Sequence, residues 1–172
     1  MTSTRQLRMT VYAALFGALT AAGAYIALPI GPVPIVLQNF FIFLAGLLLG
    51  PRWGAASVAA YLLAGFLGLP VFAGGAGGIG RLAGPTGGYL VGFLPAVYVI
   101  GLISVKRPGR PLVQVFAMVC GTGVIYACGV AWLSQVTGMS AAQSMGVGLY
   151  PFLPGDGLKI AAALPVARVP VS

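Results

Sequence analysis

The stretch VPIVLQNFFIFLAGLLLG, residues 33–50, decides the fold of this chain. Its only polar side chains are those of Gln38 and Asn39, and it contains no charged residue. A helix needs about 20 mostly apolar residues to cross the roughly 30 Å hydrocarbon layer of a membrane. We therefore interpret residues 33–50 as a membrane-spanning helix, which a tight basic turn at 51–54 connects to the next one.

The sequence around this helix has the same apolar character. Of the 172 residues, 59% are hydrophobic and only 6% are charged, and the mean hydropathy is +1.03. A water-soluble domain carries about a quarter charged residues, so the surface of this chain is expected to face lipid. At about 20 residues for each crossing, the chain has room for about six or seven. We predict an all-α integral membrane protein with six transmembrane helices in one membrane domain, residues 1–172.

Glycine, proline and basic residues separate the apolar runs. The predicted spans are about 9–30, 33–50, 55 to about 72, 89–105, 112–133 and 149 to about 166. The segment AGGAGGIGRLAGPTGG, residues 73–88, is too rich in glycine to form a regular helix. Residues 134–148 are expected to form a polar connection. The first run is longer than the roughly 7 to 15 residues of a cleavable signal core, so we expect it to remain.

The basic residues predict the orientation, because cytoplasmic loops carry the excess of Lys and Arg. If the N-terminus is inside the cell, seven of the nine basic residues lie on the cytoplasmic side: Arg5, Arg8, Arg52, Lys106, Arg107, Arg110 and Arg168. Arg81 lies outside and Lys159 lies within the last span. We expect a multi-pass protein of the cell inner (cytoplasmic) membrane with both termini cytoplasmic.

Composition excludes most enzyme chemistry. Histidine is absent, Asp156 is the only acidic residue, and the cysteines are Cys120 and Cys128. A carboxylate pair, a Ser-His-Asp triad and a histidine-rich metal cage cannot be assembled, so we expect no catalytic residue, metal or cofactor. The basic residues are scattered between apolar runs, which argues against nucleic acid despite the net charge of +8. The GxGxxG pattern at 75–80 lacks the preceding strand that dinucleotide binding requires.

Two charged residues lie within the last predicted span. Asp156 and Lys159 are three residues apart and project from one face of a helix. An ionised side chain facing lipid costs roughly 2.5 to 3.5 kcal/mol, so such residues face a bundle interior or a wet cavity. One interpretation is an ion pair that locks this helix to its neighbours. We favour a polar pocket for a ligand, because the chain has no other carboxylate.

Three further polar residues are candidates for the same site. Arg81 either touches lipid phosphate or, together with backbone N–H groups of the glycine-rich segment, holds a ligand carboxylate. Gln38 and Asn39 either bind neighbouring helices or supply donors and acceptors to a ligand ring. Spacing does not separate these alternatives.

The first span carries small residues at every fourth position. Ala14, Ala18 and Ala22, with Gly17 beside them, form a shallow groove where another helix can approach closely. Internal packing is the first interpretation. Contact with a separate membrane subunit is the alternative.

Three blocks of this sequence resemble the BioY family, the biotin-specific S components of energy-coupling-factor (ECF) transporters. They are VPIVLQNFFIFLAGLLLGPRWG at 33–54, GLPVFAGGAGGIGRLAGPTGGYLVGF at 68–93 and FLPGDGLK at 152–159. The likeness runs from about Ala14 to Lys159. It implies a six-helix S-component bundle that binds biotin near the outer face and takes part in its uptake.

The resemblance also implies partners and site residues. It assigns Asp156, Lys159 and the glycine-rich loop at 73–89 to biotin handling. It assigns the small residues Ala14 and Ala18, and with them Ala22, to contact with a transmembrane coupling subunit, which acts with a pair of cytoplasmic ATPases. A self-sufficient facilitator of biotin or a related vitamin, without ATPase partners, is the alternative.

Biotin combines a ureido ring with a carboxylate on an apolar chain. Asp156 suits the ureido N–H groups, and Lys159, Gln38 or Asn39 the ureido oxygen. Arg81 or the loop amides suit the carboxylate. The aromatic residues expected as walls of the pocket are Phe72, Tyr89, Trp132 and Tyr150.

Overall fold

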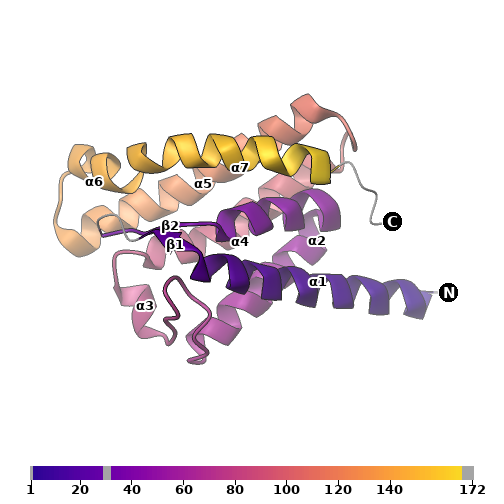
Figure 1. Ribbon diagram of the computed structural model, residues 1–172, viewed down its shortest axis with the longest axis horizontal. Helices are drawn as coiled ribbons and strands as arrows, with labels where there is room; N and C mark the ends of the chain where they lie inside the picture. Colours follow the sequence, from indigo (N-terminus) through magenta and orange to yellow (C-terminus); the bar gives the residue numbers. More distant parts are fainter. Residues whose placement is uncertain (1, 29–31, 168–172) are drawn as a thin grey trace.

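The computed structural model describes residues 2–28 and 32–167 as a bundle of helices (Figure 1). The elements are α1 Thr2–Tyr25, β1 Ala27–Leu28, β2 Ile35–Val36, α2 Gln38–Phe66, α3 Gly80–Ala83, α4 Gly87–Ser104, α5 Pro111–Thr137, α6 Ala141–Gly148, the 3₁₀ helix η1 Tyr150–Phe152, and α7 Leu153–Val166. The start of α1 and the end of α7 lie on the same side of the bundle in Figure 1. The predicted end of the first span at Ile30, and Arg168, lie outside the described residues.

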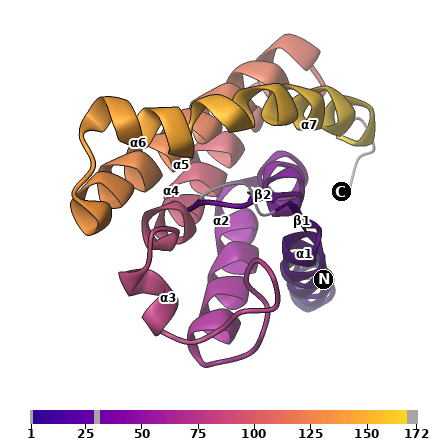
Figure 2. The ribbon, with the colours of Figure 1, turned by 60° about the vertical axis from the view of Figure 1, so that its left-hand side comes forward.

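The bundle is built around α4, which packs against α2 and α5, while α1 packs on α2. Figure 2 shows α7 lying across one side of the bundle, where it packs against α2 and α5, while α1 lies on the other side. Phe43 of α2, Ile100 of α4 and Met118 of α5 are fully buried where these helices meet. Large apolar side chains also point outward, among them Leu112 at 86% and Leu158 at 73% exposure. In a membrane such side chains face lipid.

The predicted second and third spans are two arms of α2. The break is at Gly50, whose φ of 74° and ψ of −175° lie in a region that glycine enters without steric cost. A β-carbon on Gly54 would lie 3.0 Å from the Ala45 carbonyl oxygen. Ala45 and Gly54 are nine residues apart and would be about 13 Å apart along one straight helix. Because they are in contact, the two arms fold back on each other. The chain therefore reverses at Gly50, directly before the turn predicted over 51–54, whose residues are already helical.

Among the described residues, four helices are long and apolar enough to cross a membrane: α1, α2, α4 and α5. The predicted last span is divided into η1 and α7, and α7 has only 14 residues. The structure therefore confirms a mostly helical membrane protein. Six crossings and cytoplasmic termini stay predictions.

Some elements were not predicted. After α1 the chain forms a short antiparallel pair of strands, in which Ala27 faces Val36 and Leu28 faces Ile35. The polar connection at 134–148 contains α6, which begins with a capping box: the Ser140 hydroxyl accepts from the Gln143 N–H at 3.3 Å, and Gln143 Oε1 accepts from the Ser140 N–H at 3.0 Å. The third predicted span ends at Phe66 instead of residue 72.

Candidate ligand-binding site

A cavity lies at the end of the bundle that holds the two strands and α3. The volume that the centre of a water molecule can occupy in this cavity is about 60 Å³. A cavity needs about 10–15 Å³ of such volume to hold one water. The site is therefore a cavity with room for several waters, not a dry helix contact. Five of the six predicted ligand-binding residues line it, namely Gln38, Asn39, Arg81, Tyr89 and Lys159, and Thr86 and Tyr126 add further polar groups.

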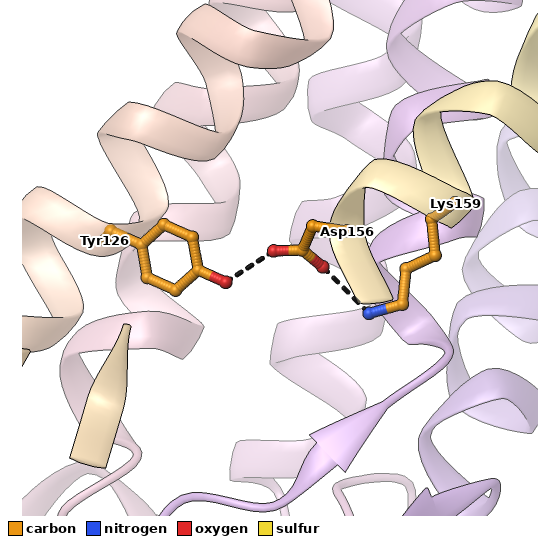
Figure 3. Close-up of polar contacts among 3 residues, drawn as sticks. All are labelled: Tyr126, Asp156 and Lys159. Carbon is orange, nitrogen blue, oxygen red and sulfur yellow. Dashed lines mark hydrogen bonds and ion pairs between the residues drawn. The ribbon is translucent and has the colours of Figure 1, made fainter. Parts of the chain in front are cut away.

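The sixth predicted residue, Asp156, does not line the cavity but is bonded to two residues that do, Tyr126 and Lys159 (Figure 3). Lys159 Nζ donates a hydrogen bond to Asp156 Oδ1 at 2.9 Å, and the two side chains form an ion pair. The Tyr126 hydroxyl donates to Asp156 Oδ2. Asp156 is 2% exposed and Lys159 is 9% exposed. Lys159 and Tyr126 line the cavity, whereas Asp156 lines an outward groove between α5 and α7.

The start of α7 explains how this pair is placed. Pro154 stands in the first turn, where a missing N–H breaks no helical hydrogen bond. Asp156 follows in the same turn, where the positive end of the helix dipole favours a carboxylate. Lys159, three residues later, projects from the same face. The prediction that the two charges face the interior is confirmed, and the pair also joins α7 to Tyr126 of α5.

The structure separates the two amides of α2. Gln38 Oε1 accepts a hydrogen bond from the Tyr61 hydroxyl at 3.3 Å, so Gln38 is held by the other arm of α2. Asn39 Oδ1 is buried and has no hydrogen-bond partner within the described residues. A buried polar atom without a partner costs about 1–3 kcal/mol. Asn39 therefore offers an acceptor without any bond at the cavity, whereas the Gln38 oxygen already accepts one bond and keeps only its second lone pair.

Arg81 and Tyr89 occupy different parts of the lining. Arg81 lies on the short helix α3 and is exposed, so it stands where the cavity meets the exterior. The Tyr89 hydroxyl donates to the Gly148 carbonyl oxygen at 2.8 Å, which holds α6 against α4. Its ring makes a T-shaped contact with Tyr126, with centroids 6.4 Å apart. Tyr89 thus contributes a wall, while its hydroxyl is already used.

The predicted aromatic walls are only partly confirmed. Phe72 lines the cavity, and its ring lies so close to Gly65 that a β-carbon there would be 2.1 Å from Phe72 Cζ. Trp132 and Tyr150 are 38% and 57% exposed and do not line the cavity. Trp132 Nε1 instead donates to the Gly84 carbonyl oxygen at 3.1 Å. These two assignments were wrong, because apolar faces toward lipid carry aromatic residues as readily as the interior does.

Sequence reasoning missed Tyr126, Phe93 and Phe152, which also line the cavity. The signal for Tyr126 was weak: a tyrosine in the middle of an apolar span needs a partner for its hydroxyl, and Asp156 was the only carboxylate available.

The small residues of α1 point away from the bundle. Ala14, Ala18 and Ala22 are all exposed, whereas a β-carbon on Gly17 would lie 3.1 Å from the Ser57 carbonyl oxygen of α2. Internal packing is therefore the wrong interpretation for the three alanines and the correct one for Gly17. An outward groove of small residues remains on α1.

The BioY family model matches residues 1–170 of this chain. The chain belongs to the BioY family. It is 46% identical over 155 residues to a protein of Pyrococcus horikoshii named "Probable biotin transporter BioY", covering 90% of this chain and 91% of that one. It is 42% identical over 161 residues to the "Biotin transporter BioY" of Thermotoga maritima, covering 94% of each.

A solved structure of the S-component for biotin from an ECF-type ABC transporter has the same fold. The TM-score is 0.90 at 32% identity, over 98% of this chain and 93% of that one. The family resemblance and the S-component-like bundle are thereby confirmed. As a member of the BioY family, the chain is a multi-pass membrane protein of a transporter family.

Proposed function

We propose that this protein is the substrate-binding membrane subunit of a biotin uptake transporter. It captures biotin at the outer face of the inner membrane and delivers it inward with a transmembrane coupling subunit and two cytoplasmic ATPases. The observation that carries this proposal is the cavity. Polar side chains from α2, α3 and α7 line it together with mostly apolar residues. The names of the relatives supply the substrate.

The charges around the cavity match the two ends of biotin. Asp156 neutralises Lys159 at the inner end, which suits the uncharged ureido ring. Arg81 makes no ion pair within the part of the chain that the structure describes, and no second acidic side chain exists to supply one. Arg81 at the mouth therefore suits the carboxylate of biotin.

The hydrogen-bonding groups match the ureido ring as well. Lys159 Nζ has three hydrogens, one of which is bonded to Asp156, so the others can reach the ureido oxygen. Asn39 Oδ1 is the free acceptor for a ureido N–H. Asp156 acts mainly by holding Lys159, although each of its oxygens retains a second lone pair. The rings of Phe72, Tyr126 and other aromatic residues surround the apolar part of the ligand.

Two features support the proposed partners. Ala14, Ala18 and Ala22 leave a groove on α1 where a helix of the coupling subunit can approach closely. ATP hydrolysis is assigned to separate subunits, because a magnesium nucleotide site uses acidic ligands and the only acid of this chain is buried beside Lys159.

The proposal is tested by binding labelled biotin to the purified protein in detergent. We expect Asp156→Asn to weaken binding at least tenfold, about 1.4 kcal/mol. Gln114→Leu is the matched control, because Gln114 is also buried and polar but lies 11 residues, about 17 Å, from Ile125 of the cavity wall along α5. Equal binding by wild type and Asp156→Asn would remove Asp156 from the site.

Reconstitution separates the subunit from a self-sufficient facilitator. Proteoliposomes that contain the protein alone are expected to bind biotin without accumulating it. Accumulation is expected only after the coupling subunit, the ATPases and ATP are added. ATP-independent equilibration of biotin by the protein alone would establish the facilitator instead.

A further inference from the structure

Two arginines from different helices line one groove at the end of the bundle opposite the cavity. Arg5 of α1 and Arg52 of the second arm of α2 are both exposed and face this space together with Trp53. Met9 and Leu49 provide its apolar surface. The break at Gly50 places Arg52 at this end, because the second arm of α2 begins directly after it. We call this space the arginine groove.

The chain has no acidic side chain that can neutralise the arginine groove. Asp156 is the only acid in the sequence, and it is bonded to Lys159 and Tyr126 beside the ligand cavity. Guanidinium groups bind phosphate with paired hydrogen bonds. Two of them facing one groove therefore favour an anion from outside the chain.

The arginine groove continues into a second, more apolar groove. Arg52 and Ala56 line both spaces, and the second one runs between α2 and α4 past Ala55, Ala59 and Pro95. From Arg52 to Ala59 the helix advances about 10 Å away from the basic end. A charged groove that continues into an open, mostly apolar groove fits a molecule with an anionic head and a hydrocarbon tail.

We propose that the arginine groove binds an anionic phospholipid, with its phosphate on Arg5 and Arg52 and an acyl chain along Ala55 and Ala59. Trp53 lies where the polar and apolar parts of the lipid meet, a position that tryptophan favours in membranes. An acidic segment of another protein would satisfy the charges but would not use the apolar groove between α2 and α4. The lipid accounts for both.

The test measures lipid retained by the full-length protein in neutral detergent, by native mass spectrometry. Dioleoyl phosphatidylglycerol is compared with dioleoyl phosphatidylcholine for the wild type and for two double variants, R5Q/R52Q and R107Q/R110Q. Both variants remove two charges, but Arg107 and Arg110 do not line the arginine groove. Thermal unfolding of each variant verifies that it is folded.

We expect the wild type to retain phosphatidylglycerol at least fivefold better than phosphatidylcholine. R5Q/R52Q is expected to lose this preference, and R107Q/R110Q to keep most of it. Inorganic phosphate in large excess should not displace the lipid, because the acyl chain adds to the binding. Displacement by phosphate would identify a simple anion site and overturn the lipid assignment. Equal loss in both variants would overturn it as well, since the preference would then come from net charge alone.

No preference in the wild type would also overturn the proposal. In that case Arg5 and Arg52 would be free for acidic side chains of another protein.

Discussion

The ion pair between Asp156 and Lys159 can be tested by removing its charges one at a time and together. Lys159→Met leaves the carboxylate of Asp156, which is 2% exposed, with the Tyr126 hydroxyl as its remaining partner. Breaking one side of a buried ion pair costs about 3–5 kcal/mol. Because Lys159 lies on the wall of a cavity with room for water, we expect the lower end of this range, about 3 kcal/mol.

The double variant Asp156→Asn/Lys159→Met removes both charges. Its amide oxygen still accepts from Tyr126, and replacing a buried ion pair by neutral groups is often neutral for stability. We expect the double variant to unfold within about 1 kcal/mol of wild type. Both variants should bind biotin at least tenfold more weakly, about 1.4 kcal/mol, since Lys159 is proposed to reach the ureido oxygen.

The assay is thermal unfolding in one detergent, combined with biotin binding. For a chain of this size 1 kcal/mol corresponds to about 2–4 °C in Tm, so Lys159→Met should lower Tm by roughly 6–12 °C and the double variant by no more than about 4 °C. Lys106→Met is the control, because Lys106 is exposed and outside the cavity. A double variant as unstable as Lys159→Met, or one that binds biotin like wild type, would refute this reasoning. The second result would mean that the pair only holds helices together.

Three other predictions concern single residues. Tyr126→Phe removes one hydrogen bond to Asp156 and should destabilise the protein by about 1.5–3 kcal/mol, measured by Tm; an unchanged Tm would contradict the bond. Asn39→Leu removes an acceptor without a partner, so biotin binding should fall about tenfold while Tm is maintained or raised; a loss of Tm without a loss of affinity would make Asn39 structural. Ala18→Trp fills the outward groove of α1, so biotin binding should be unchanged while module-dependent uptake is lost; normal uptake would place the coupling subunit elsewhere.

The helices could be predicted from the sequence because lipid allows few alternatives to apolar helical segments. The reversal within α2 was indicated by Pro51, and only its position differed, since Gly50 supplies the positive φ. Helix α6 was missed although Ser140 and Gln143 spell a capping box, because the polar composition of the segment suggested a loop. The strands β1 and β2 are too short to show a pattern.

The polar part of the site could be predicted because polar side chains within a membrane span require an explanation. This reasoning singled out Lys159, Asp156 and the amides Gln38 and Asn39, and the structure places Lys159 and both amides at the cavity and buries Asp156. It could not show that Asp156 itself does not line the cavity, which depends on how α5 and α7 pack. Two of the four aromatic walls, Trp132 and Tyr150, were misplaced, and the outward direction of the α1 alanines was left open, since apolar residues give no sign of whether they face protein or lipid.

The most direct test of the account is an experimental structure of the protein with biotin at saturating concentration. We predict biotin in the cavity, with the ureido ring within about 3 Å of Lys159 Nζ and Asn39 Oδ1 and the carboxylate beside Arg81. Biotin bound at another place, with this cavity holding only water, would contradict the account.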